Sequence, residues 1–255
     1  MKITNKQGLP DVLVNAITND PYTRGDGVYR SITELINPPQ IAYLKRKYDD
    51  KLTMDIADRM YALYGRLIHQ VLEDSGESVA DMITEQRLFT DIFHRRISGS
   101  FDSFTYSNKT LNDYKFVSVY KMNNGVPKEY TQQLNCYAYL LSEAGTDVEN
   151  LTVTTMYRDW SASRAGNKNY PDSIAQVHPV ELWTRAQQKD YLEERVYAHK
   201  NYNESTWSLN SCSPEERWER GATRQTRKQV RCESYCEVAS VCPQYKEILE
   251  TKYGE

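Results

Sequence analysis

The sequence has little glycine or proline, no long apolar run and only a small net charge. Eleven glycines and nine prolines among 255 residues are too few for a fibrous or disordered chain. A net charge of −3 excludes a protein that binds polyanions over its whole surface, so any nucleic-acid site must be a local patch. A hydrophobic fraction of 39% is enough for a core, and the length fits one large domain or one domain with a small appendage.

Signals for export and membrane insertion are also lacking. The opening residues, MKITNKQGLPDVLVN, have no apolar core of the signal-peptide kind, and no run approaches the length that spans a membrane. We therefore expect a cytoplasmic location and no membrane partner. Cysteine is sparse as well: Cys136 stands alone and four others lie in the last fifth of the chain. Because the cytoplasm keeps thiols reduced, we do not expect disulfides.

The order of the apolar patterns predicts an α/β fold with a mixed sheet flanked by helices. We expect a short helix in SITELINPP, a longer one over about 53–74, and a helix over 129–145 closed by Gly145. Strands are expected in 83–106, as two strands broken near Thr90-Asp91, and then at 111–119, 151–160 and 173–183. A polar helix over 184–203 ends this part, and a compact cysteine-bearing appendage begins at about 205.

The stretch GSFDSFTYSNKTLNDYKF, residues 99–116, places acidic residues on both sides of a turn. Asp102 precedes the turn, and Asp113 and Lys115 follow it on the next strand. A D-x-K triplet is expected about once by chance in a chain of this length, so it has meaning only with support from its neighbours. Asp113 and Lys115 share one face of their strand because side chains alternate along a strand.

Two helices supply that support. Gly65 and His69 lie four residues apart on one face of the 53–74 helix, and Gln133 and Tyr137 lie four apart on the helix that follows the D-x-K strand. Each pair alone is more simply a half-buried core feature. Together the pieces give the order G-x-x-x-H, a strand aspartate, D-x-K and Q-x-x-x-Y.

This order resembles the RecB-type branch of the PD-(D/E)xK nuclease superfamily, and is most similar to small RecB-like exonucleases of bacteriophages and to CRISPR-associated iron–sulfur exonucleases. The resemblance runs from about Ser31 to Tyr137, and more loosely to Cys242. It implies a restriction-endonuclease-like core at 1–204 and a cysteine-rich metal-binding lobe at 205–255. It also implies a phage-encoded, metal-dependent DNA exonuclease in replication, recombination or DNA degradation, with DNA as its partner and a helicase or a recombination or replication protein as a further candidate partner.

The resemblance also assigns roles to residues. Mg²⁺ or Mn²⁺ would be held by His69, Asp102, Asp113 and the backbone carbonyl of Phe116; the catalytic residues would be Asp102, Asp113 and Lys115; Gln133 and Tyr137 would contact the substrate backbone. The chemistry needs such a set, because carboxylates hold a cation against the phosphate while an ammonium group stabilises the developing charge. A histidine ligand suits Mn²⁺ better than Mg²⁺. Two further acids, Glu73 and Glu85, are more simply solvated.

The spacing Cys212-x19-Cys232-x3-Cys236-x5-Cys242 predicts a shared metal centre. Four thiolates suit either Zn²⁺ or a [4Fe–4S] cluster. Iron–sulfur relatives of this branch have a cysteine before the first motif helix, but this chain has none before 136, so Cys212 would be the fourth ligand. The Cys242-Pro243 pair resembles the end of many iron–sulfur motifs and favours iron, with zinc as the alternative.

A basic segment, RWERGATRQTRKQVRC, lies between these cysteines and contains six cations. We expect Arg224, Arg227 and Lys228 to contact DNA phosphates, although a solvated face explains such a segment equally well. Two other functions stay open. One is a DNA-binding recombination or packaging accessory with the nuclease fold and little catalysis, which the complete D…D-x-K set disfavours. The other is a structural metal protein whose cysteine lobe docks a partner.

Overall fold

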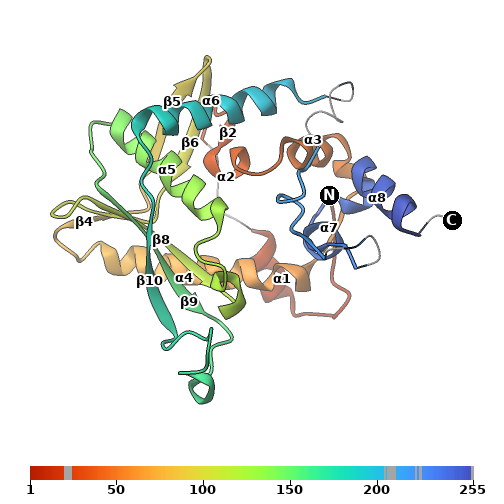
Figure 1. Cartoon of the computed structure of the whole chain (residues 1–255), viewed down its shortest axis with the longest axis horizontal. Coiled ribbons are helices and arrows are strands. Elements are labelled where there is room, and N and C mark those ends of the chain that lie inside the picture. Colours follow the sequence, from red (N-terminus) through yellow and green to blue (C-terminus); the bar gives the residue numbers. More distant parts are fainter. Residues whose placement is uncertain (20–24, 204, 206–210, 222, 224–225, 254–255) are drawn as a thin grey trace. The chain divides into compact units, whose positions relative to one another are not determined.

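The computed structural model describes residues 1–19, 25–203, 205, 211–221, 223 and 226–253 (Figure 1). It is a mixed α/β structure, as the sequence predicts, and its chain divides into two compact units. Unit 1 contains Met1–Asn19, Asn37–Arg59 and Arg195–Glu255; unit 2 contains Asp20–Ile36 and Met60–Glu194. No helix within the described ranges is long and apolar enough to cross a bilayer.

Unit 2 contains a five-stranded mixed sheet in the order β10-β9-β8-β7-β4. Its strands are β4 (Met82–Thr84), β7 (Ser103–Thr105), β8 (Thr110–Val117), β9 (Asn150–Tyr157) and β10 (Ala175–Val180). β8 and β9 are parallel, and the other neighbours are antiparallel. A parallel pair needs a crossover connection, which is supplied by the helix between β8 and β9.

A second sheet in unit 2 has three strands in the order β2-β6-β5, with β2 at Arg30–Ser31, β5 at Arg87–Ile92 and β6 at Arg95–Ser100. β5 and β6 form a hairpin whose two-residue turn is Phe93 and His94. The strand break expected near Thr90-Asp91 is wrong, because Thr90 and Asp91 pair with Ile97 and Arg96 inside the ladder. The region 83–106 therefore contains four short strands rather than two.

Helices of unit 2 pack on these sheets. α5 (Lys128–Glu143) contacts β5, β6, β8 and β9, and α4 (Met60–Gly76) contacts β4 and β8. α5 follows Pro127 and ends before Gly145, whose φ of +86° suits glycine. Residues 134–141 of α5 are all buried, and each fully buried leucine there contributes about 1.5–3 kcal/mol. The short helix α2 (Ile32–Leu35) begins with a capping box formed by Ser31 and Glu34.

The long helix α4 starts later than its apolar spacing predicts. Residues Thr53–Asp55 form β3, which pairs in parallel with β1 (Lys2–Thr4), and Ile56–Arg59 form the 3₁₀ turn η2. The Asp55 carboxylate accepts hydrogen bonds from the Thr4 hydroxyl and from the backbone N–H groups of Lys6 and Ala57. These long-range contacts override the local helical pattern over 53–59.

Unit 1 joins residues from both ends of the sequence. Its remaining elements are α1 (Asp11–Thr18), α3 (Pro39–Lys47), η1 (Asp49–Lys51), β11 (Glu219–Arg220), β12 (Lys228–Gln229), α7 (Val230–Ser234), η5 (Ala239–Val241) and α8 (Pro243–Tyr253), together with the last part of α6 (Arg185–Asn201). Leu44 and Leu52 share one buried cluster with Val238 and Cys242. The cysteine-bearing segment thus packs with residues 37–59, whereas the expected boundary at 204/205 assigns those residues to the nuclease core.

Candidate functional site

Five charged or ligating side chains come together in unit 2 from separate elements. His69 lies on α4, Glu85 lies just before β5, Asp102 lies between β6 and β7, and Asp113 and Lys115 lie on β8. Each of them acts electrostatically on at least one of the others. We call His69, Glu85, Asp102 and Asp113 the carboxylate site, beside which Lys115 lies.

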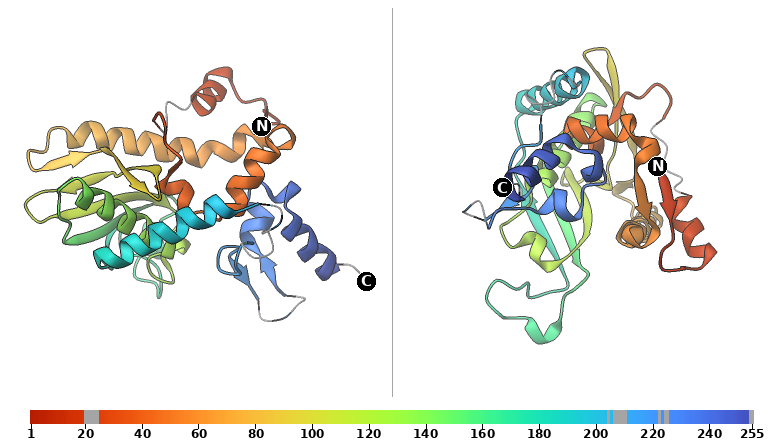
Figure 2. Two further views of the ribbon diagram at one scale, coloured as in Figure 1. Left: turned by 90° about the horizontal axis from the view of Figure 1, so that it is seen from above. Right: turned by 90° about the vertical axis from the view of Figure 1, so that its right-hand side faces the viewer.

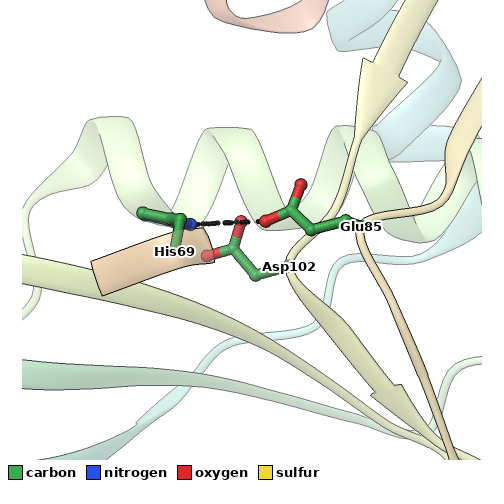
Figure 3. A group of neighbouring side chains, drawn as sticks. All are labelled: His69, Glu85 and Asp102. Atoms are coloured by element: carbon green, nitrogen blue, oxygen red, sulfur yellow. Dashed lines mark hydrogen bonds and ion pairs between the residues drawn. The ribbon is translucent and has the colours of Figure 1, made fainter. Parts of the chain in front are cut away.

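His69, Glu85 and Asp102 are arranged as a group that could hold a cation (Figure 3). The His69 Nδ1 atom lies 3.4 Å from Glu85 Oε1 and 3.5 Å from Asp102 Oδ1. In the described part of the chain this is the one set of three His, Cys, Asp or Glu residues whose ligand atoms all lie within 4.8 Å. One nitrogen and two carboxylate oxygens on one side of a small space form a donor set suited to Mn²⁺ or Mg²⁺.

Backbone contacts fix two of these carboxylates. Asp102 Oδ2 accepts a 2.6 Å hydrogen bond from the Tyr114 N–H, and the Glu85 N–H donates to the Asp102 carbonyl at 3.1 Å. Glu85 has a φ of 48°, in the left-handed region that a glutamate seldom adopts. Such strain is typical of positions held for a functional reason. Sequence reasoning set Glu85 aside as solvated, and the left-handed backbone that brings it to the site has no local sequence signal.

Asp113 and Lys115 form an ion pair at the edge of this group. Lys115 Nζ lies 2.6 Å from Asp113 Oδ2, a hydrogen-bonded ion pair, while Asp113 Oδ1 has no hydrogen-bond partner among the described residues. Asp113 is only 2% exposed. The lysine therefore balances the charge but leaves one buried oxygen unsatisfied, which is costly. A bound cation would supply the missing contacts.

The pKa values follow from this crowding. Burial raises the pKa of Asp102 to about 7, and the Asp113 carboxylate acts in the same direction. The hydrogen bond with Glu85 raises the pKa of His69. Burial alone would lower the pKa of Lys115, but the carboxylates of Asp113 and Asp102 outweigh it, so that the pKa is raised. Near neutral pH the site thus retains protons that a divalent cation could replace.

Phe116 is expected to act through its backbone carbonyl, and the direction of that carbonyl follows from strand alternation. The Tyr114 N–H points to Asp102, while the Val117 carbonyl on the other side of β8 accepts from Arg158 N–H at the end of β9. Phe116 is two residues from Tyr114, so its carbonyl points to the same side as Asp102. β7 pairs with β8 only over residues 110–112, so it does not reach this carbonyl.

Gln133 and Tyr137 lie on α5 as expected. The Gln133 amide donates a 2.9 Å hydrogen bond to the Tyr137 hydroxyl, and Tyr137 is 4% exposed. A Cβ on Gly99 would come within 2.7 Å of the Tyr137 ring, so glycine is needed for this close packing. Burial raises the pKa of Tyr137, and the Asp113 and Asp102 carboxylates add to the effect. Tyr137 thus lies near the carboxylates, with its hydroxyl held by Gln133.

Cys212, Cys232, Cys236 and Cys242, the cysteine site, all lie in unit 1. Burial raises the pKa of every one of these thiols, to about 12 for Cys212 and about 11 for Cys232. The thiols also act on one another: Cys232 and Cys242 raise the pKa of Cys212, and Cys236 raises the pKa values of Cys232 and Cys242. The four thiols are therefore close enough to interact electrostatically.

One buried glutamine links two members of the cysteine site. The Gln40 side chain is fully buried; its Nε2 donates to Cys242 Sγ at 3.2 Å, and its Oε1 accepts from the Cys212 N–H at 3.1 Å. No three cysteine ligand atoms in the described ranges come within 4.8 Å of one another. The metal-free thiols are thus near one another without being drawn into a closed ligand set.

The basic segment is largely occupied by internal pairs. Arg227 Nε lies 3.1 Å from Glu219 Oε1, and Arg217 also pairs with Glu219. Lys228 is exposed on β12, opposite Arg220 in the ladder. Arg224, the third expected DNA contact, lies outside the described residues. Arg227 is thus available to phosphate only in competition with Glu219.

Comparisons with known proteins give a fold relationship and no family. No family model matches the sequence, and no curated protein matches it. Among solved structures, the chain is similar to one titled "Crystal structure of SSO0001", with a TM-score of 0.57 and 14% identity. That match covers 92% of this chain and 95% of the other. At this identity, the likeness shows that the two chains share a fold over nearly their whole lengths.

Proposed function

We propose that this protein is a metal-dependent deoxyribonuclease of the RecB-type PD-(D/E)xK class, which acts on DNA as an exonuclease. The observation that carries the proposal is the buried Asp113 carboxylate, whose Oδ2 meets the Lys115 ammonium, whose Oδ1 has no partner among the described residues, and which lies beside Asp102. Packing alone gives no reason to gather these groups, because each buried charge lowers stability unless it is compensated. A divalent cation and a phosphate compensate all of them.

The residues of the carboxylate site fit such a cation. Asp102, Asp113 and His69 would hold it, with Glu85 as an additional carboxylate. The cation supplies charge neutralisation at the phosphate and an acidified water. Lys115, whose raised pKa keeps it charged, donates to the oxygen on which charge develops or orients the attacking water. Its contact with Asp113 Oδ2 holds the ammonium group at the reacting position.

The cysteine site would hold a [4Fe–4S] cluster. The Cys242-Pro243 pair supports this choice, as does the Gln40 N–H donated to Cys242 Sγ, because hydrogen bonds to the ligand sulfurs are a common feature of such clusters. The cluster would be structural, because Cys242 and Cys236 pack with the Leu44, Leu52 and Val238 cluster and none of the four cysteines lies on an element of the carboxylate site.

The test is cleavage of linear and circular DNA, single- and double-stranded, with Mn²⁺, Mg²⁺ or EDTA. We expect degradation of linear DNA with Mn²⁺ and none with EDTA. Asp113→Asn should lower the rate by about 10²–10³-fold or more, since it removes charge from the reacting centre. Asp190→Asn, an exposed carboxylate on α6, is the matched control and should leave the rate unchanged.

Each alternative has its own outcome in this assay. A protein that binds DNA but does not cleave it with either metal is the accessory protein. One that neither binds nor cleaves is a structural metal protein. Cleavage of circular DNA at the rate of linear DNA would replace the exonuclease with an endonuclease, and an active Asp113→Asn variant would contradict the assignment of the site.

A further inference from the structure

The β5–β6 hairpin presents an exposed aromatic tip on a backbone that aromatic residues rarely adopt. Its turn residues Phe93 and His94 have φ angles of 50° and 58°, so both are left-handed. Two-residue turns of this type strongly favour Asn-Gly, because a larger side chain is strained there. Phe93 is 49% exposed and adds little core packing to offset the strain. A strained, exposed ring indicates a contact with a ligand.

Arginines stacked on aromatic rings lie behind this tip. The Cζ atoms of Arg30 and Arg95 lie 4.9 Å and 5.3 Å from the ring centre of Tyr29, and that of Arg96 lies 4.5 Å from the ring centre of Phe89. A guanidinium group held on a ring loses little freedom when it binds a ligand. The exposed guanidinium groups of Arg95 and Arg96 can donate to phosphate oxygens, whereas Arg30 donates through Nη1 to the Tyr29 carbonyl at 3.0 Å.

The hairpin carries positive charge. Residues 87–96 contain three arginines and one acid, Asp91, which lies opposite Arg96 in the ladder. Arg95 and Arg96 are exposed, and neither forms an ion pair within the described part of the chain. Unpaired guanidinium groups beside exposed rings are the combination that single-stranded nucleic acid binds, through its phosphates and its base faces.

The hairpin also leads directly to the carboxylate site. β5 begins two residues after Glu85, and β6 ends two residues before Asp102. Figure 2 shows this yellow ribbon projecting from the rest of unit 2. A six-residue strand spans about 20 Å. Stacked nucleotides rise about 3.4 Å each along one strand. A strand that lies along the hairpin, with one base at the tip, would therefore place a phosphate at the carboxylate site about six nucleotides away.

We propose that the β5–β6 hairpin, together with Tyr29 and Arg30, is a nucleic-acid-binding arm. Arg95 and Arg96 leave opposite faces of β6 and bind phosphates of one strand where it passes around the hairpin tip; Arg30 lies behind them on Tyr29, and Phe93 stacks on an unpaired base at the tip. The assignment rests on the proposed nuclease function and specifies its substrate as DNA with a single-stranded end. A closed duplex offers Phe93 no base face, so the arm selects unpaired DNA.

The arginines are tested by binding of a fluorescein-labelled 20-nucleotide oligothymidine in EDTA, where no cleavage occurs. Arg95→Gln/Arg96→Gln should weaken binding about tenfold and lower the slope of log affinity against log salt by about 1.4, or 0.7 for each lost phosphate contact. Lys189→Gln/Lys200→Gln removes two exposed cations of α6 and is the matched control, with an unchanged slope expected.

The ring is tested by Phe93→Asn/His94→Gly, which gives the turn its preferred residues. This variant should melt at a higher temperature than the wild type, because the strained residues are gone. Its affinity for the oligothymidine should nevertheless fall about tenfold, the loss of one base–aromatic stack. A protein that gains stability and loses binding cannot have lost binding through unfolding.

The outcomes separate the arm from the nuclease. Wild-type affinity and salt slope in both hairpin variants overturn the arm, even when the wild-type protein cleaves DNA. Loss of binding in the variants, with no cleavage by the wild type in Mn²⁺, supports the arm and overturns the nuclease. A Phe93 variant that sediments as a smaller species with unchanged affinity shows that the tip contacts a second copy of the chain, which also overturns the arm.

Discussion

The carboxylate site and the cysteine site both gather metal-ligating side chains, but they differ in their dependence on the surrounding core. The carboxylate site lies beside strands whose core residues, Phe101, Phe104 and Leu111, are apolar and at most 1% exposed. At the cysteine site, Cys242 is itself a member of the buried cluster of unit 1. Unit 2 should therefore fold without a cation in the carboxylate site, whereas the cysteine site is part of the core of unit 1.

The two sites also differ in the electrostatic cost of burying their ligands without a metal. At the carboxylate site, Asp113 keeps a buried oxygen without a hydrogen-bond partner among the described residues, and only Lys115 balances its charge. At the cysteine site, burial raises the thiol pKa values, so the metal-free cysteines are neutral and bury easily. Removing the metal should therefore leave unit 2 folded, whereas unit 1 should unfold, because the burial of neutral thiols does not replace the contribution of the metal.

The largest effect is expected from a cysteine ligand. Cys242→Ser should lose the cluster and the folded structure of unit 1, because a structural metal contributes about 10–16 kcal/mol to a small core. Hydrogen exchange should become fast over 37–59 and 226–253 and stay slow in β8 and α5. Cys136→Ser, a buried thiol on α5, is the control and should keep its metal at a cost of about 1 kcal/mol.

Visible absorption and elemental analysis of the anaerobic protein complete that test. We expect a brown wild-type protein that contains iron, and a colourless Cys242→Ser variant. A colourless wild-type protein with one equivalent of zinc would replace the cluster with zinc. Equal iron content in the wild type and Cys242→Ser would mean that the cysteine site is not the cluster site.

A smaller effect is expected at the carboxylate site. His69→Ala should weaken Mn²⁺ binding at least about tenfold, since a ligand is lost while the carboxylates remain. Raised Mn²⁺ should restore part of the cleavage rate, and EDTA should leave the melting of unit 2 intact. Gln70→Ala, on an exposed position of the same helix, is the control. A His69→Ala variant that unfolds, or that binds Mn²⁺ like the wild type, would mean that His69 is a packing residue.

The sequence predicted best what depends on local patterns. The α/β class, the β8 strand that carries Asp113 and Lys115, and the α5 helix with Gln133 and Tyr137 all follow from periodicity over one element. The convergence of His69 with Asp102 could be anticipated only from a resemblance, because these residues are 33 positions apart and no local rule links α4 to the β6–β7 connection.

The features that sequence reasoning missed depend on long-range pairing or on unusual backbone. Residues 53–55 look helical but pair with β1, some 50 positions away, so unit 1 is assembled from three segments that composition cannot connect. The Phe93-His94 turn has none of the Asn-Gly chemistry that marks such a turn. Glu85 reaches the carboxylate site through a left-handed φ that a glutamate seldom adopts.

The smallest expected effect concerns the charge of Asp102. It tests most directly the difference between the carboxylate site and the cysteine site. The folded pKa of Asp102, about 7, lies above the ordinary 3.8, so the folded protein holds a proton that the unfolded chain releases. The stability from that proton is complete below about pH 4 and is lost as pH rises through 7. In EDTA at pH 8, Asp102→Asn should therefore raise the melting temperature by about 3 °C, the shift for roughly 1 kcal/mol in a chain of this size.

The gain should shrink toward zero at pH 5, where the wild-type carboxyl is protonated, and Asp190→Asn should show no such dependence. Saturating Mn²⁺ at pH 8 should reverse the order, because the wild type is stabilised by the bound cation and the variant has lost a ligand. A metal-free Asp102→Asn protein that is less stable than the wild type at pH 8 would show that this carboxylate supports the fold, and would remove the distinction between the two sites.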